Sequence, residues 1–227
     1  MAGRGITQPI VVVCEGPSDC SLVNALARHH FLAGIQAICP EDQGGGFSEL
    51  SRLLTALSGQ PRWRTMKGFF LVVDANGNIV QRLRDVTALL APYNLQVTAP
   101  FVVQNGTPAR AVYLLPGPNR TGCLEHLLLD AVHENDANLI TCVDAFAACV
   151  QMPTSWSDNL QAKMKVHSLI AGCCEDDPAS ALSRIWNHAS NPVPISSSVF
   201  VDLVNLLRQF ASIALFYDVS TAFGWKV

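Results

Sequence analysis

Two apolar runs in the first third of the chain end abruptly at an acidic residue, and this pattern restricts the fold more than any other feature of the sequence. Residues 10–14 are mostly β-branched and lead into Glu15, and residues 68–73 lead into Asp74. Each run precedes a segment whose apolar residues recur at helical spacing. Continuous apolar runs are typical of parallel strands that helices bury on both faces. The pattern therefore predicts a parallel sheet covered by helices.

The alternation of strand and helix repeats over the first half of the chain. Ser18 is expected to cap the helix after the first strand, since serine is a preferred cap residue. A second strand at 35–39 stops at Pro40, and the glycines at 44–46 lead to a leucine-rich helix. Segments 101–103 and 111–115 are predicted to pair as a hairpin through Asn105-Gly106. The expected fold is a mainly parallel α/β sheet, Rossmann-like, with an antiparallel edge.

Strand signals nearly vanish after Gly117. Helical spacing of apolar residues predicts helices at about 122–134, 137–150, 158–171, 178–189 and 199–216. We expect an α/β core at 1–120 and a helical C-terminal elaboration at 121–227 that packs on it. Polar residues interrupt the last helix at Asp202, Asn205 and Arg208, which favours a core helix over a membrane span.

Charge and cysteine content restrict the partners and the compartment. The net charge is −3, so the whole molecule lacks the basic character typical of a nucleic-acid binder. The charge is +2 over residues 1–119 and −5 over the rest, so a polyanion would meet the first half more easily. The eight cysteines form no CxxC pair and are expected to be buried thiols. No signal-peptide core precedes Glu15, which predicts a cytoplasmic protein without a membrane partner.

The acids at the strand ends are the strongest functional signal. Ligands of open parallel sheets bind where the carboxyl ends of the strands meet, and adjacent strands lie about 4.8 Å apart. Glu15 and Asp74 are therefore expected to lie close together if their strands are neighbours. Asp19 and Asn76 follow them within four residues and add further oxygen atoms. Oxygen ligands of this kind suit Mg²⁺ or Mn²⁺.

These residues resemble a known family. The run from Cys14 to Asp19 (CEGPSD) after one strand, and Val72-Val73-Asp74-Ala75-Asn76 at the end of another, resemble the Toprim fold of topoisomerases, bacterial primases and OLD-family nucleases. The run at 114–116 (LLP) and the later run at 122–125 (GCLE) are similar to uncharacterised Toprim-like proteins related to OLD nucleases. The resemblance covers about residues 8–130, and more loosely a helical tail that includes Lys163.

The resemblance implies a Mg²⁺-dependent nuclease or phosphotransfer enzyme that acts on nucleic-acid phosphodiesters. By match, Glu15 is a general acid or base or a metal ligand, and Asp74 holds the metal. Asp19 and Glu125 are further candidate metal ligands, and Lys163 is similar to a lysine that steadies the anionic transition state. The sequence departs from the family at Asn76, where a second Asp is usual. Asparagine offers a carbonyl oxygen without charge, which weakens cation binding.

Other interpretations of the same residues stay open. The chain is alternatively a Toprim-fold binding module without catalysis, in a DNA-processing or defence system, or an unrelated α/β domain that binds a small phosphorylated ligand. An acid at a strand end can simply cap the next helix. The glycines at 44–46 are more typical of a loop than of a phosphate site, because no GK[ST] follows. The sequence leaves open a homo-oligomer or a partner protein.

Two further clusters receive a structural interpretation. Arg62, Trp63, Arg64 and Lys67 combine basic and aromatic side chains, as a nucleic-acid contact would. They precede the third strand, however, and so are expected at the end of the sheet opposite the acids, as a solvated loop. The six histidines are scattered and indicate no hydrolase triad.

Overall fold

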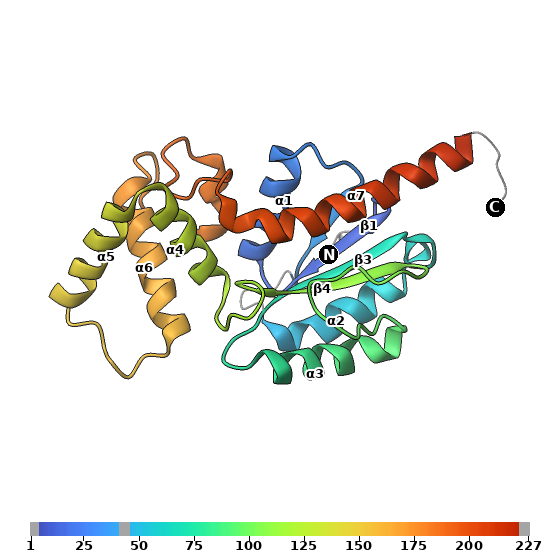
Figure 1. The fold of residues 1–227 in the computed structure, drawn as a ribbon, viewed down its shortest axis with the longest axis horizontal. Coiled ribbons are helices and arrows are strands. Elements are labelled where there is room, and N and C mark those ends of the chain that lie inside the picture. Colours follow the sequence, from blue (N-terminus) through green and yellow to red (C-terminus); the bar gives the residue numbers. More distant parts are fainter. Residues whose placement is uncertain (1–4, 41–45, 223–227) are drawn as a thin grey trace.

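The computed structural model describes residues 5–40 and 46–222, and its core is a parallel sheet (Figure 1). All pairings between neighbouring strands are parallel, and the strand order is β2-β1-β3-β4. The predicted α/β fold is confirmed at this level, and the sheet is compatible with a Rossmann-like fold. The strands are β1 (Ile10–Cys14), β2 (Ile35–Ile38), β3 (Gly68–Asp74) and β4 (Ala109–Leu115).

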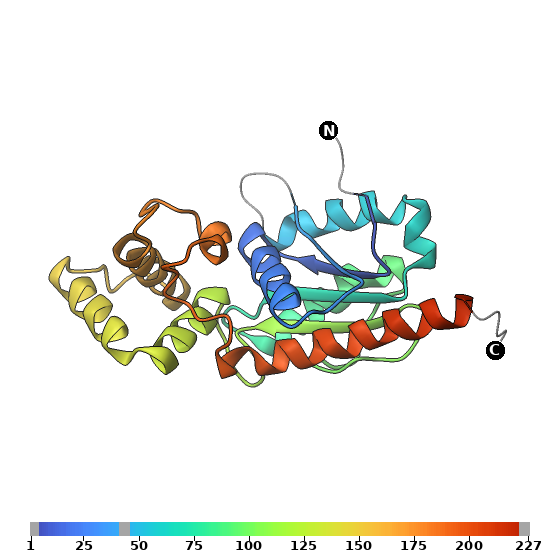
Figure 2. The same ribbon diagram turned by 90° about the horizontal axis from the view of Figure 1, so that it is seen from above.

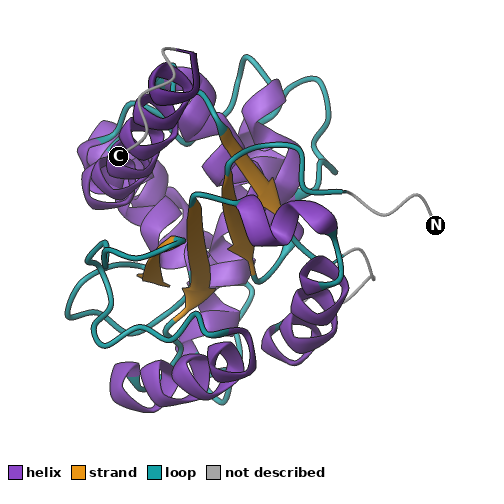
Figure 3. Ribbon diagram, turned by 90° about the vertical axis from the view of Figure 1, so that its right-hand side faces the viewer, coloured by secondary structure: helices purple, strands orange, loops and turns teal. Residues whose placement is uncertain are grey.

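Helices cover both faces of the sheet (Figure 3). Side chains of β1 alternate between two cores: Ile10 and Val12 point to one, and Val11 and Val13 to the other. This alternation on a strand that is buried throughout explains its continuous apolar sequence. The first core is shared with α1 (Pro17–His29) and α7 (Val201–Ala222), and the second with α2 (Phe47–Ser58) and α3 (Ile79–Leu90).

Three helices form a lobe beyond the carboxyl ends of the strands (Figures 1 and 2). These are α4 (Leu124–Asn135), α5 (Ala137–Cys149) and α6 (Asp158–Cys173). Short 3-10 helices connect the longer elements: η1 (Pro61–Thr65), η2 (Ala91–Tyr93), η3 (Leu182–Asn187) and η4 (Ser198–Phe200). After the lobe, α7 returns along the sheet, so the helical second half and the sheet share one core.

Helix α7 packs closely on the strands. The ring of Phe210 stacks on that of Phe70 with centroids 5.3 Å apart, and Leu203 and Leu207 are fully buried. One helix of the described chain, over Ser198–Leu215, is long and apolar enough to cross a membrane, and 44% of that window is buried inside the protein. The predicted core helix is therefore confirmed by its contacts with the sheet.

The predicted antiparallel edge is not shown as a strand of the sheet. β4 lies at the edge of the sheet and runs parallel to β3, and residues 101–103 form no strand. Among the described residues, an isolated antiparallel bridge between Gln104 and Arg110 and a hydrogen bond from the Phe101 N–H to the Val112 oxygen join this segment to β4. Phe101 has a φ of 63°, in the left-handed region, so the extended backbone that a ladder needs is broken there.

The predicted helix at 178–189 is wrong, because this segment contains only η3. Two residues of η3, Leu182 and Ile185, are buried. They are too few to form the apolar stripe of an α-helix. The buried Ser180 contacts His188 instead, with 2.9 Å between Oγ and Nε2. This contact joins the two ends of the segment and favours a compact loop.

The prediction that the eight cysteines are buried is confirmed only in part. Five of the eight are buried and Cys173 is partly buried, whereas Cys142 and Cys149 on α5 are exposed. Helix α5 lies at the outer side of the lobe, and only Val143 and Ala147 along it are buried. The sequence of α5 has few polar residues and its apolar residues extend beyond one stripe, so they did not distinguish its outer face.

Candidate functional site

Glu15 and Asp74 lie side by side at the carboxyl edge of the sheet. Their strands are neighbours, with Cys14 opposite Val72 in the parallel register. The backbone N–H of Asp74 donates a hydrogen bond to Oε2 of Glu15 over 3.1 Å. The two acids are thus brought together as the sequence predicted.

Asp19 joins this edge from the first turn of α1. Its Oδ2 accepts a hydrogen bond from the backbone N–H of Gly16 over 2.9 Å, and Gly16 is the cap residue of the helix. The prediction that Ser18 caps this helix is therefore wrong, because the cap lies two residues earlier. Asp19 is 8% exposed. Burial, and then the charges of Asp74 and Glu15, raise the pKa of Asp19 well above its ordinary value.

Asp74 connects the sheet to the lobe. Its Oδ1 accepts a hydrogen bond from the backbone N–H of Leu124, the first residue of α4, over 3.0 Å. Burial raises the pKa of Asp74 to about 7, and the charges of Glu15 and Glu125 add to the effect. Lys163 and the Leu124 N–H lower it in part. At neutral pH this carboxyl group is therefore poised between its charged and neutral forms.

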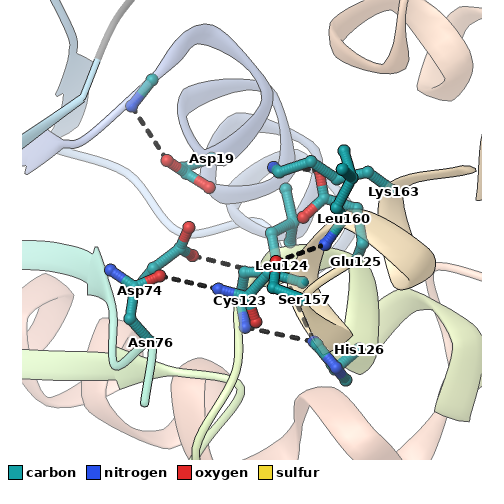
Figure 4. A network of polar contacts seen from close by, with 12 residues as sticks. Asp19, Asp74, Asn76, Cys123, Leu124, Glu125, His126, Ser157, Leu160 and Lys163 are labelled. Atoms are coloured by element: carbon teal, nitrogen blue, oxygen red, sulfur yellow. Dashed lines mark hydrogen bonds and ion pairs between the residues drawn. The ribbon is translucent and has the colours of Figure 1, made fainter. Parts of the chain in front are cut away.

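Glu125 and Lys163 complete the cluster from the lobe (Figure 4). Glu125 is only 5% exposed, and the Nζ of Lys163 on α6 donates to its Oε1 over 2.7 Å. The other oxygen, Oε2, is buried and has no hydrogen-bond partner among the described residues. Burial lowers the pKa of Lys163, but the hydrogen bond and charge of Glu125 outweigh this, and the net shift is upward.

Arg82 is a member of the site that the sequence did not reveal. It is buried in α3, donates through Nε to the backbone oxygen of Asp74 over 2.7 Å, and lies 3.7 Å from Oε2 of Glu15 through Nη2. Its guanidinium group stacks on Phe47 of α2 at 4.4 Å from the ring centroid. The one available signal was its position on the apolar stripe of α3, three residues after Ile79.

Asn76 has a different role from its neighbours. Its backbone φ is 54°, a conformation in which asparagine is enriched. Its N–H and C=O pair with Gly122, and its Oδ1 accepts a hydrogen bond from Asn159 Nδ2 over 2.8 Å. Gly122 has a φ of 134°, and a Cβ there would lie 2.8 Å from Nδ1 of His126. The Asn76 side chain is therefore bonded to α6, and its oxygen is engaged.

The four carboxylates do not yet form a metal site as they stand. Within residues 5–40 and 46–222, no three His, Cys, Asp or Glu side chains are arranged closely enough to hold an ion. Backbone N–H groups, Arg82 and Lys163 hold the acids in place instead. The donor set is nevertheless of the kind that hard cations take, and the buried Oε2 of Glu125 is open to one.

The other sequence motifs lie apart from this cluster. Arg62 and Trp63 belong to η1, before the start of β3, and Trp63 packs edge-on against Phe69 and Tyr93. Of the glycine loop, Gly46 caps α2, whereas Gly44 and Gly45 lie outside the described residues.

Cys123 does not form a reactive pair with its neighbour His126. Burial and the charge of Glu125 raise the pKa of this thiol, and the backbone N–H of Cys123 donates to Nδ1 of His126. A protonated, buried thiol is not a nucleophile. The contact between Cys123 and His126 therefore caps α4.

Comparison with known proteins gives one result. A family model described as "Protein of unknown function (DUF3226)" matches residues 9–211. Neither the curated proteins nor the solved structures contain a match to the chain. The matched region contains every element from β1 to the first half of α7, and with it all the residues of the acid cluster. The chain therefore belongs to the DUF3226 family.

Proposed function

We propose that this chain is a Toprim-fold nuclease or phosphotransfer enzyme that uses Mg²⁺ or Mn²⁺ to act on nucleic-acid phosphodiesters. One observation carries the proposal: Glu15, Asp19, Asp74 and Glu125 come from three separate parts of the chain and converge at the carboxyl edge of the sheet. This edge is where open α/β sheets bind their ligands. The same four acids were expected to act together from the sequence resemblance.

The electrostatics of the cluster support a bound cation. Four carboxyl groups face two cationic side chains, Arg82 and Lys163, and mutual repulsion contributes to the raised pKa of Asp19 and Asp74. Strongly perturbed pKa values cluster at functional sites. Glu125 Oε2 is buried and has no partner in the described part of the chain, which costs free energy unless a ligand satisfies it. A divalent cation held by these four residues would relieve both.

Each residue then has a definite role. When bound, the cation supplies charge neutralisation at the phosphate and a more acidic water. Glu15 is the general acid or base, and Arg82 and the Asp74 N–H fix its carboxylate. Lys163 is about half exposed and supplies positive charge beside the anionic transition state. Asp74 holds the metal and also fixes the first turn of α4 through Leu124.

The experiment is a calorimetric titration of Mg²⁺ and Mn²⁺ into the parent protein and into the Glu15→Gln and Asp74→Asn variants. Asp144→Asn serves as the matched control, because it removes one carboxylate from the outer helix α5. The same samples are then incubated with single- and double-stranded DNA and RNA. We expect binding and cleavage in the parent and the control, and loss of both in the two site variants. Parent protein that binds no metal at millimolar concentration contradicts the proposal.

A second candidate function is a Toprim-fold binding module without catalysis, and Asn76 is the observation that favours it. Toprim enzymes usually carry an Asp at this position, and here an uncharged amide is engaged by Asn159. Restoring the acid tests this interpretation. If Asn76→Asp gains metal binding and cleavage that the parent lacks, the parent is a module that has lost its chemistry. If the parent is already active, the module hypothesis fails.

A further inference from the structure

A polar pocket lies along α1, beside the acid cluster. It has a volume of about 570 Å³ and is lined by Pro17, Ser21, Asn24 and Arg28 of α1 and by Ser183 and Asn187 of η3. We call it the α1–η3 pocket. Cys39 and Pro40, which follow β2, also line it. The volume is within the range of small-ligand sites, roughly 300–1,000 Å³.

The geometry of α1 connects this pocket to the site. Pro17, Ser21, Asn24 and Arg28 are spaced by four, three and four residues and so share one face of the helix. From Pro17 to Arg28 this face is ~16 Å long at 1.5 Å per residue. Cys39 and Pro40 follow β2, the strand beside β1, so this end of the pocket lies at the same carboxyl edge of the sheet as Glu15. Asp19 is two residues from Pro17 and lies on the opposite face of α1, so the pocket approaches the carboxylates at the sheet edge and leads away from them along the helix.

η3 turns this helix face into one wall of a pocket. The hydroxyl group of Ser21 donates a hydrogen bond to the backbone oxygen of Ser183 over 2.5 Å and joins the two walls. Ser183 belongs to the segment that does not form the predicted α-helix. The loop that replaces this helix therefore shapes the pocket.

The lining has the chemistry of a nucleotide site. Among its described residues are two amide side chains and one guanidinium group, and no acid. Arg28 is exposed at the far end, and the described residues offer it no acidic partner. Arginine is a preferred phosphate ligand, and asparagine amides pair with base edges. A carboxylate ligand would also satisfy Arg28, but it would leave the amide groups and the adjacent acid cluster unexplained.

We propose that the α1–η3 pocket binds a nucleotide unit of single-stranded nucleic acid, next to the phosphodiester that the acid cluster cuts. This inference rests on the proposed function and names its substrate class. Arg28 holds a phosphate, and Asn24 and Asn187 contact the base or sugar. A pocket of this volume accommodates a nucleotide-sized unit. A base can enter it only when it is unpaired, so single strands or unpaired ends are the substrates.

The test measures binding of fluorescein-labelled ten-residue single strands and of the matching duplex by fluorescence anisotropy. The buffer contains Ca²⁺ in place of Mg²⁺, and a gel checks that the strand stays intact. Arg28→Gln removes the cation, and Asn24→Trp fills the pocket from an exposed helix position. Arg84→Gln is the matched control, an exposed arginine on α3 at the opposite face of the sheet. Calorimetric Mg²⁺ titrations are run on every variant.

The expected result is tighter binding of the single strand than of the duplex, with about tenfold weaker binding in Arg28→Gln and Asn24→Trp. Arg84→Gln binds the strand as the parent does, and all variants keep the Mg²⁺ affinity of the parent. If the parent binds metal and cuts nucleic acid but both pocket variants match Arg84→Gln, the pocket assignment is wrong and the proposed function stands. Equal or tighter duplex binding overturns the single-strand assignment. A parent without Mg²⁺ binding overturns the proposed function itself.

Discussion

At the scale of single residues, the surroundings of Asp74 disfavour its charged form, so ionisation of this carboxyl group destabilises the folded protein. The carboxyl group is largely buried and lies near Glu15 and Glu125, so its pKa rises from 3.8 to about 7. Between pH 4 and 7 the folded protein keeps a proton that the unfolded chain has already released. The free energy of unfolding therefore falls as the pH rises through this window and levels off above it.

Asp74→Asn is expected to stabilise the metal-free protein at pH 8, by an amount on the order of 2 kcal/mol, and to have little effect at pH 4. The amide oxygen of asparagine can still accept the Leu124 N–H, so α4 stays attached. Thermal melts in EDTA at the two pH values measure the difference. Asp144→Asn, on an exposed carboxylate, is the control and should show no such pH dependence. An equal effect at both pH values would contradict the raised pKa.

Arg82 supports the site from inside the protein. Its side chain joins β3, β1 and α2 through Asp74, Glu15 and Phe47. Arg82→Gln leaves the Asp74 oxygen without its donor and the Glu15 carboxylate without its nearest cation, so we expect a loss of about 2 kcal/mol of stability. Urea denaturation midpoints measure it. Arg84→Gln, on an exposed arginine two residues along α3, should change the midpoint little, and an equal effect of both would argue against this role.

At the scale of elements, the close contact between α7 and β3 depends on a glycine. A Cβ at Gly68 would lie 2.5 Å from the Phe210 ring and 2.8 Å from Ile10. Gly68→Ala is therefore expected to destabilise the protein by about 1–3 kcal/mol through overpacking. Denaturant unfolding measures this, and Gly172→Ala on α6, where a Cβ meets nothing within 4 Å, is the control.

A double-mutant cycle separates this clash from a general effect of alanine. In a Phe210→Leu background the smaller side chain leaves room for the new methyl group, so Gly68→Ala should cost less there. The same cost in both backgrounds would mean that the ring of Phe210 does not set the limit.

The helices and strands of this fold were predictable where the pattern of buried apolar residues alone determines the type of element. The strands at β1 and β3 and the helices of the lobe follow from apolar periodicity, and the acids at the strand ends follow from the register of a parallel sheet. The hairpin and the helix at 178–189 were not predictable, because the left-handed backbone of Phe101 and the contact between Ser180 and His188 decide them. Arg82 was missed because its position on the apolar stripe of α3 was its one signal, and that position does not indicate which groups a buried arginine meets.

At the scale of the whole molecule, a bound cation would join the sheet to the lobe. Glu15 and Asp74 belong to the sheet edge, and Glu125 belongs to α4. Under the proposed function, Mg²⁺ at ten times its dissociation constant should add about 1.4 kcal/mol to the stability. For a chain of this length that is a rise of ~3–6 °C in melting temperature relative to EDTA. Differential scanning fluorimetry measures it.

The variants give this melting experiment its controls. Asp74→Asn should lose the Mg²⁺-dependent rise, whereas Asp144→Asn should keep it. Because Asp74 has to release its proton to bind a cation, the rise should also be larger at pH 8 than at pH 6. A rise of the same size in Asp74→Asn would mean that the ion binds elsewhere.

The position of α7 has a consequence for how the chain folds during synthesis. Its residues from Leu203 to Ala214 complete the core beneath one face of the sheet, yet they are made after the whole lobe. The side chains on that face, among them Ile10, Val12 and Phe70, are not covered by α7 while the lobe is being synthesised. Until α7 is made, a nascent chain therefore carries an uncovered apolar surface, and exposed surfaces of this kind are what chaperones bind. The synthesis of α7 is in this sense the step that lowers the risk of aggregation.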